Sequence, residues 1–102
     1  MLLIYTTAPD EQICKALAQG AIQAKYAACA NIIPSIISVY EWEENITTSQ
    51  EYAILFKTLE HKAQDLIRFI CDNHPYKVPA IVQIQGKTTN NFMQYLQKNL
   101  KY

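Results

Sequence analysis

The sequence predicts an α+β protein of the ferredoxin-like order β-α-β-β-α-β, with a long bent hairpin in its middle and an extra C-terminal helix. Four segments have the apolar, β-branched or aromatic pattern of strands: residues 2–7, 29–43, 51–58 and 80–85. Two segments between these strands, and one after them, repeat apolar residues at helical spacing. No linker or low-complexity stretch interrupts the chain, so we expect one domain over residues 1–102.

The first strand leads directly into a predicted helix. Pro9 suits the first helical position, and the acidic Asp10 and Glu11 suit the positive end of the helix dipole. The apolar residues that follow at helical spacing are mostly small: Ile13, Ala16, Leu17, Gly20, Ala21 and Ala24. This narrow face predicts close packing of the helix on a sheet.

The middle of the chain is predicted to form a long hairpin. Residues 29–43 are rich in Ile, Val, Tyr and Trp, and they are interrupted only by Pro34, which removes a ladder donor and predicts a bulge or bend. Glu44 and Asn45 offer a turn, because asparagine tolerates the left-handed conformation. Residues 51–58 then form the returning strand.

Two further helices are predicted in the second half. The first has Thr58 as its N-cap and ends at His74 and Pro75, because the residue before a proline disfavours helical backbone. Its apolar face follows helical spacing: Ala63, Leu66, Ile67, Ile70 and Cys71. After the fourth strand, Asn90 or Asn91 is expected to cap a terminal helix. One side of that helix is apolar: Phe92, Leu96 and Leu100.

Charge and composition narrow the choice of partners and compartment. Nine basic and nine acidic side chains cancel without forming blocks, so neither nucleic acid nor a membrane surface is an expected partner. The apolar run at residues 1–5 is too short for a signal-peptide core or a membrane span, which predicts a cytoplasmic location. Three cysteines without CxxC spacing predict reduced thiols and disfavour a zinc motif that is local in sequence.

No catalytic motif is present in the sequence. Two glycines are too few for a phosphate-binding loop, and neither Gly-x-Ser-x-Gly nor His-Glu-x-x-His occurs. A nucleophile pair of Cys29 and His74 has no identifiable oxyanion donor. We therefore expect a protein that is not an enzyme.

Five motifs in register resemble the CutA family. They are Thr7-Ala-Pro-Asp10, Ala27-Ala-Cys-Ala-Asn-Ile-Ile-Pro34, Tyr40-Glu-Trp-Glu43, Lys57-Thr58 and His74-Pro-Tyr-Lys-Val-Pro79. The resemblance covers residues 3–96. It implies a ferredoxin-like fold, a tightly packed homotrimer, a cytoplasmic location and a role in tolerance to copper and other divalent cations, with no obligatory cofactor.

The chain departs from the family pattern where a metal ion could gain ligands. Lys77 and Ala80 stand where the family usually has glutamate, Thr89-Asn90-Asn91 replaces the usual Gly-Asn, and Gln97 stands where tryptophan is common. If the missing carboxylates support a metal in the family, this chain should bind cations more weakly.

Cys29 and His74 are the candidate metal ligands, because copper and zinc accept both thiolate and imidazole. The two residues are far apart in sequence, so only the fold can join them. The alternative is structural, with Cys29 as a small buried apolar residue and His74 as a helix-end residue whose ring binds exposed carbonyls. Cys14 and Cys71 are expected to face the core, and His61 is expected to be solvated.

Five residues are candidates for a cleft or an interface: Asn31, Tyr40, Trp42, Lys57 and Tyr76. Tyr40 and Trp42 share one face of the long strand, and packing in a core or between subunits is favoured over a ligand cage. Lys57 is the one cation in an apolar strand, so it either emerges at the surface or meets an anion in a cleft.

Three functions follow from these expectations. A sheet covered by helices on one face leaves its other face and its hairpin for neighbouring subunits to cover, which predicts an oligomer. The first function is a metal-responsive trimer that binds cations in clefts between subunits. The second is a PII-like sensor of a small ligand, for which Lys57 and Tyr76 would converge on a pocket. The third is a structural trimer that anchors another protein.

Overall fold

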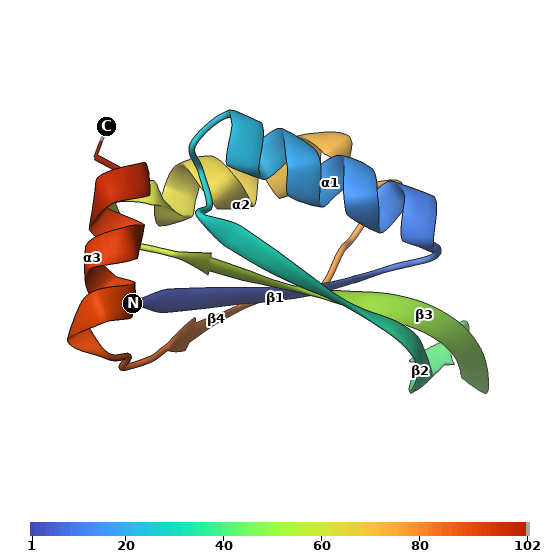
Figure 1. Ribbon diagram of the computed structural model, residues 1–102. Coiled ribbons are helices and arrows are strands. Elements are labelled where there is room, and N and C mark those ends of the chain that lie inside the picture. The colour runs from blue at the N-terminus through green and yellow to red at the C-terminus, as the bar shows by residue number, and fades with distance from the viewer. Residues whose placement is uncertain (102) are drawn as a thin grey trace.

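The computed structural model describes residues 1–101, which form one four-stranded antiparallel sheet and three α-helices (Figure 1). The elements in chain order are β1 (Leu2–Ala8), α1 (Glu11–Gln23), β2 (Cys29–Trp42), β3 (Asn45–Thr58), a 3₁₀ turn (Glu60–Lys62), α2 (Ala63–Asn73), β4 (Ile81–Gln85) and α3 (Asn90–Asn99). The strand order in the sheet is β2-β3-β1-β4. The predicted ferredoxin-like order, with its long hairpin and extra C-terminal helix, is therefore confirmed.

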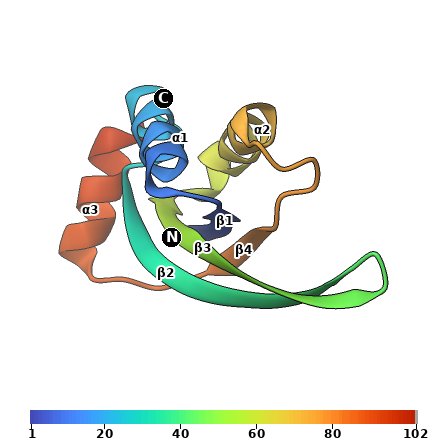
Figure 2. The ribbon, with the colours of Figure 1, turned by 90° about the vertical axis from the view of Figure 1, so that its right-hand side faces the viewer.

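Helices α1 and α2 lie together on one face of the sheet (Figures 1 and 2). The main hydrophobic core lies between these two helices and the sheet. Every second residue of β1 is buried there, because successive side chains in a strand point to opposite faces. The small residues of α1 allow α2 to come close. A Cβ atom on Gly20 would lie 2.6 Å from the Phe69 ring, so a larger residue at this position would force that ring to shift.

The predicted irregularity at Pro34 is a β-bulge that changes which residues of β2 face outward. The register with β3 shifts between Ile33 and Ile36, and Ser35 within this shift has a φ of 57°. Ile33 pairs with Ala53 and Ile36 pairs with Glu51, and these two partners of β3 lie on the same face of the sheet. The bulge thus carries Tyr40 and Trp42 onto the open face, on the side away from the helices.

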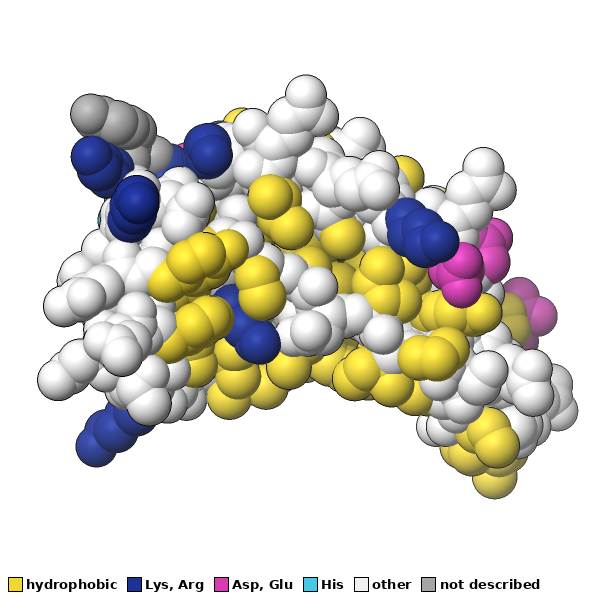
Figure 3. Space-filling view, in the orientation of Figure 1, with side chains coloured by type: hydrophobic (Ala, Val, Ile, Leu, Met, Phe, Trp, Pro, Cys, Tyr) yellow, Lys and Arg dark blue, Asp and Glu magenta, His cyan; other side chains and the backbone are white. Residues whose placement is uncertain are grey.

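The far half of the hairpin extends beyond the helices (Figure 2). It exposes large apolar side chains on both of its faces. One face carries Ile37, Val39 and Ile46, which are 68%, 66% and 82% exposed. The opposite face carries Tyr40 and Trp42, and Trp42 is 63% exposed. Figure 3 shows hydrophobic side chains gathered at this end of the molecule. A hairpin of this kind leaves two apolar surfaces in water.

Several predicted turns and caps are placed one or two residues away from the observed ones. Asp10, rather than Pro9, begins α1, because its carboxylate accepts a 2.8 Å hydrogen bond from the Ile13 amide. Thr89 caps α3 in the same way, so the prediction of Asn90 or Asn91 was wrong. The hairpin turn consists of Glu43 and Glu44, both with positive φ, and β3 begins earlier than predicted, at Asn45.

Two predictions about the second helix were also wrong. Thr58 does not cap α2, because it ends β3 and its buried hydroxyl donates a 2.7 Å hydrogen bond to the Tyr26 carbonyl. Cys71 is exposed and does not face the core. The apolar face of α2 is centred on Leu66 and Ile70, and Cys71 lies about 100° further around the helix.

Helix α3 packs across one end of the sheet, against Ala28 and Leu59 (Figure 1). Leu96 and Leu100 are fully buried in this second apolar cluster. His61 is exposed, as expected, and its ring also forms a 2.8 Å hydrogen bond through Nε2 with the Leu100 carbonyl. This bond ties the end of α3 to the turn before α2.

Candidate functional site

An open groove of about 810 Å³ lies between the hairpin and the loop that joins α2 to β4. The hairpin and β1 contribute Thr7, Ser38, Val39, Tyr40, Trp42 and Glu51, and the loop contributes Pro75, Tyr76, Lys77, Val78 and Ala80. A volume of this size is typical of sites for small organic ligands. The groove contains three of the predicted cleft residues, Tyr40, Trp42 and Tyr76.

His74 fixes the loop of the groove to the sheet through both of its ring nitrogens. The Tyr76 amide donates a 3.0 Å hydrogen bond to Nδ1, so Nδ1 acts as an acceptor. Nε2 therefore carries the proton, and it donates a 2.7 Å hydrogen bond to the Thr7 carbonyl. No lone pair of the ring is left free for a metal ion in this arrangement.

Glu51 and Tyr76 form the polar centre of the groove. The Tyr76 hydroxyl donates a 2.7 Å hydrogen bond to Glu51 Oε2, and Glu51 is only 8% exposed. Burial, together with this bond to the carboxylate, raises the pKa of Tyr76 well above 10, so the phenol keeps its proton. Burial acts to raise the pKa of Glu51, but hydrogen bonds from the Ser38, Tyr76 and Thr7 hydroxyls outweigh it. With the electrostatic effect of His74, they lower the pKa from its ordinary value.

The predicted aromatic pair lines the outer part of the groove. Tyr40 and Trp42 follow each other on the open face of β2, and the Tyr40 hydroxyl accepts a 3.3 Å hydrogen bond from Ser49. Both side chains are exposed in the single chain. Lys77 and Val78 complete the lining on the loop side.

Cys29, Asn31 and Lys57 lie at the other end of the sheet. Cys29 pairs with Lys57, and the Lys57 amine lies 5.6 Å from the centre of the Phe92 ring in α3. Asn31 is exposed two residues further along β2. Within one chain, Lys57 therefore does not converge with Tyr76 on a pocket.

Cys29 and His74 do not meet within one chain. Lys57, the partner of Cys29, also pairs with Leu3 of β1, whereas His74 is bonded to Thr7, four residues further along the same strand. Four residues of a strand span about 13 Å, which is far beyond the reach of one metal ion. Among residues 1–101, no three His, Cys, Asp or Glu side chains come together closely enough to hold a metal.

The three cysteines have different surroundings. Cys14 is fully buried in the core, as predicted, and burial with the nearby Asp10 raises its pKa to about 11. Cys29 is half-buried, and Cys71 is exposed. All three are free thiols. Cys29 is thus the one thiol that combines partial exposure with a position on the open face of the sheet.

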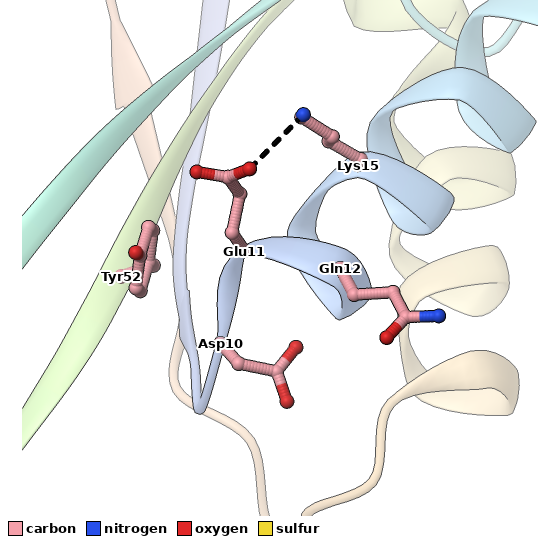
Figure 4. A pocket seen from close by; sticks show the side chains of 5 residues that line it. All are labelled: Asp10, Glu11, Gln12, Lys15 and Tyr52. Carbon is pink, nitrogen blue, oxygen red and sulfur yellow. Dashed lines mark ion pairs between the residues drawn. The ribbon is translucent and has the colours of Figure 1, made fainter.

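A second hollow of about 650 Å³ lies at the start of α1 (Figure 4). Its charged groups already have partners: Asp10 caps the helix, and Glu11 forms a 3.0 Å ion pair with Lys15. Tyr52 forms the opposite wall. Because the charged groups of this hollow are already engaged, the groove at Glu51 is the better candidate.

Sequence reasoning missed Glu51 and misplaced Lys57. The signal for Glu51 was available, because Glu51 directly precedes the apolar run from Tyr52 to Phe56, where the strand alternation puts it on the same face as Ala53. An acidic residue at the inner end of such a run needs hydrogen-bond donors from elsewhere. The bulge at Pro34 was predicted, but the register shift that puts Ser38 on the same face as Glu51 could not be read from the sequence.

Comparisons with known proteins agree with this architecture. Residues 2–99 match the family model described as CutA1 divalent ion tolerance protein. The chain is 36% identical over 83 residues to the chloroplastic CutA protein of Arabidopsis thaliana, which covers 81% of this chain and 46% of that protein. It is 30% identical over 98 residues to the divalent-cation tolerance protein CutA of Thermus thermophilus, which covers 95% of each.

A solved structure extends the likeness to three dimensions. The CutA1 divalent ion tolerance protein from Ehrlichia chaffeensis superimposes with a TM-score of 0.94 at 34% identity, over 97% of this chain and 94% of that one. The chain spans about half the length of the curated plant and vertebrate relatives that it matches. The family is a divalent ion tolerance family and not an enzyme family. The chain belongs to the CutA1 divalent ion tolerance protein family.

Proposed function

We propose that the chain acts as a homotrimer that binds copper or another divalent cation weakly in the clefts between its subunits. The observation that supports assembly is the projecting hairpin. Its two faces expose Ile37 and Val39 on one side and Trp42 on the other, and apolar side chains of this size gain about 2 kcal/mol each when they are buried. The number three comes from the resemblance of the sequence to CutA.

The open face of the sheet supports the same assembly. Val82 and Ile84 of β4 are 46% and 43% exposed on that face, and Ile33 of β2 is 45% exposed. Together with the hairpin, these residues form an apolar surface that a monomer would leave in water. Neighbouring copies of the chain would cover it.

The cation is proposed from family membership and from the chemistry of two residues. Cys29 offers a soft thiolate on the open face, and His74 offers an imidazole once it gives up one of its two hydrogen bonds. Each is a single ligand within its own subunit, so a site needs groups from more than one subunit. The cost of freeing His74 and the positive charge of the neighbouring Lys77 both predict weak binding.

A cytoplasmic location is proposed with the trimer. The three free cysteines fit a reducing compartment, because exposed thiols such as that of Cys71 oxidise elsewhere. No helix among the described residues has the length and apolar character needed to cross a membrane.

Light scattering coupled to size-exclusion chromatography tests the assembly. The expected mass is three times the 11.7 kDa of one chain, and a mass of 11.7 kDa would contradict the proposal. Calorimetric titration of the purified protein with copper tests the cation site, and an absence of measurable heat of binding at neutral pH would contradict it.

A further inference from the structure

Two backbone groups hold the ring of His74 in one tautomer. The Tyr76 amide can only donate, so Nδ1, which lies 3.0 Å from it, is the unprotonated nitrogen. The Thr7 carbonyl can only accept, so Nε2, which lies 2.7 Å from it, carries the proton. The lone pair of the ring is therefore on Nδ1. Only this atom can bind a cation without a change of tautomer.

The local sequence produces this arrangement. Pro75 disfavours helical backbone at the residue before it, and His74 accordingly is extended, with φ −83° and ψ 138°, directly after α2. The Tyr76 amide then returns to Nδ1, and the Tyr76 ring lies 4.8 Å from the imidazole, centre to centre. The Tyr76 hydroxyl continues to Glu51 in β3. The imidazole thus takes part in fixing the loop 74–80 to the sheet.

The two ring nitrogens differ in what they would lose on binding a cation. Coordination through Nε2 would move the proton to Nδ1, so the bond to the Thr7 carbonyl would be lost and the Nδ1 proton would face the proton of the Tyr76 amide. Coordination through Nδ1 costs only the bond from the Tyr76 amide. Because hydrogen bonds of this kind contribute similar free energies, Nδ1 is the less costly position.

The bond from Nε2 to Thr7 suits a histidine that coordinates through Nδ1. Metal-binding histidines normally donate their other ring N–H to a carbonyl or carboxylate, which fixes the ring and makes it a better ligand. Here β4 pairs with β1 only as far as Thr6, so the Thr7 carbonyl lies beyond that ladder and accepts from His74 instead. The Thr7 carbonyl therefore orients the ring, whereas the Tyr76 amide occupies the lone pair.

We propose that Nδ1 of His74 is the cation-coordinating atom, that the Tyr76 amide blocks it in the cation-free protein, and that cation binding releases the loop 74–80 from the sheet. This inference rests on the proposed function, because it takes His74 as one ligand and leaves the others to the assembly. The amide and the hydroxyl that bonds Glu51 belong to the same residue, so displacing the amide weakens the Tyr76 bond to Glu51 as well.

Nitrogen-15 NMR of the imidazole rings tests which atom coordinates. Zinc(II) is the probe, because it is diamagnetic and binds imidazole. We expect Nε2 of His74 to stay protonated and the Nδ1 signal to move when zinc(II) is added. His61 is the only other histidine and serves as an internal control, since its Nε2 bonds the Leu100 carbonyl. No zinc(II)-dependent change at His74, or a proton that moves from Nε2 to Nδ1, would overturn the proposal.

Calorimetry of the same samples separates this failure from that of the proposed function. Zinc(II) binding without a change in the His74 signals overturns only the assignment of Nδ1. If neither zinc(II) nor copper binds, the proposed cation binding is contradicted as well.

Tyr76→Phe tests the coupling between the loop and the cation. The variant keeps the amide that bonds Nδ1 and removes the hydroxyl that bonds Glu51. Because the anchored loop opposes displacement of the amide, we expect zinc(II) affinity to rise about threefold to tenfold. Tyr40→Phe is the matched control, since its hydroxyl bonds only the exposed Ser49, and it should leave the affinity unchanged. An affinity that is unchanged or lower in Tyr76→Phe would show that the loop does not compete with the cation.

Hydrogen exchange of the Tyr76 amide measures the release of the loop in the wild type. This amide is protected by Nδ1 in the cation-free protein, and saturating zinc(II) should accelerate its exchange at least about tenfold. The Gly86 amide, which bonds the Met1 carbonyl, should exchange at the same rate with and without zinc(II). Exchange of the Tyr76 amide that is unchanged or slowed by zinc(II) would overturn the proposal, because the loop would then stay closed over the bound cation.

Discussion

The hydroxyl of Tyr76 donates a 2.7 Å hydrogen bond to the carboxylate of Glu51, across 25 positions of the chain. The bond joins the loop before β4 to the inner half of the hairpin. The same loop is attached to β1 through His74, which accepts from the Tyr76 amide and donates to the Thr7 carbonyl. The loop from His74 to Tyr76 thus links β1 and β3, leads into β4, and shapes the groove.

Tyr76→Phe is expected to destabilise the protein by about 2 kcal/mol at neutral pH, because a hydrogen bond to a buried charged group is lost. The pKa of Glu51 is lower in the folded protein than its ordinary 4.5, so Glu51 contributes stability above pH 4.5 that disappears as the pH falls through its folded value. Removing the Tyr76 hydroxyl should raise the pKa of Glu51 in the folded protein, because one donor to the carboxylate is lost. Chemical denaturation followed from pH 7 to pH 2 should therefore show that the two proteins converge in acid.

Tyr95→Phe is the control for this measurement. Tyr95 is 46% exposed on α3, and we expect its variant to unfold with the wild-type free energy at every pH. A Tyr76→Phe deficit that persisted unchanged at pH 2 would mean that the loss comes from packing and not from the charge of Glu51.

Thr6→Val is expected to stabilise the protein by about 1 kcal/mol. Thr6 is fully buried in β1, and its hydroxyl has no hydrogen-bond partner among the described residues. Valine has nearly the same shape and removes the cost of burying that hydroxyl. Thr58→Val is the matched comparison, because the Thr58 hydroxyl donates to the Tyr26 carbonyl at 2.7 Å and its loss should destabilise by about 1 to 3 kcal/mol. Thermal melts that move in the same direction for both variants would refute this account.

Trp42→Ala is expected to weaken assembly by about 3 kcal/mol, since a large aromatic side chain that anchors an interface is removed. In the single chain Trp42 is 63% exposed, so its truncation should cost little within one subunit. Sedimentation equilibrium over a range of concentrations separates the two effects. A variant that stays trimeric at the same concentrations as the wild type would place Trp42 outside the interface.

The order of elements could be predicted because the apolar patterns that define them are local. Alternation in the strands and helical spacing around Leu66 and Ile70 do not depend on distant residues. The bulge could also be predicted from a local signal, because Pro34 has no backbone N–H to donate a hydrogen bond to the neighbouring strand. Short-range signals failed where two neighbours competed for one role, as at Thr89 and Asn90, both of which are good N-caps.

The site could be predicted only in part, because its contacts join residues that are far apart in sequence. The motif containing His74 and Tyr76 was identified, but the direction of the imidazole depends on Thr7, 67 positions earlier. Lys57 and Tyr76 both looked like cleft residues, yet Lys57 lies six residues along β3 from Glu51, about 20 Å away. The sequence does not reveal such distances until the strand register is known.

Copper is expected to bind weakly, and Cys29→Ser is expected to reduce the affinity about tenfold or more while the trimer remains intact. Serine keeps the size of the side chain and removes the soft thiolate that copper prefers. His74→Ala should lower the affinity as well, but it also breaks the bonds to Thr7 and Tyr76, so its thermal stability must be measured alongside. Cys71→Ser is the control, because Cys71 is equally free but lies on the exposed face of α2.

The pH dependence of the titration provides the second criterion for the copper site. A thiolate and an imidazole must both lose their protons before they coordinate, so copper affinity should fall as the pH is lowered from 7.5 toward about 5. Lys77→Glu restores a carboxylate next to His74 and should raise the affinity in the same experiment. Isothermal titration calorimetry of the wild type and these variants measures each effect. Equal affinities in wild type, Cys29→Ser and Cys71→Ser would remove Cys29 from the site, and tight binding that survives Cys29→Ser combined with His74→Ala would require ligands elsewhere in the trimer.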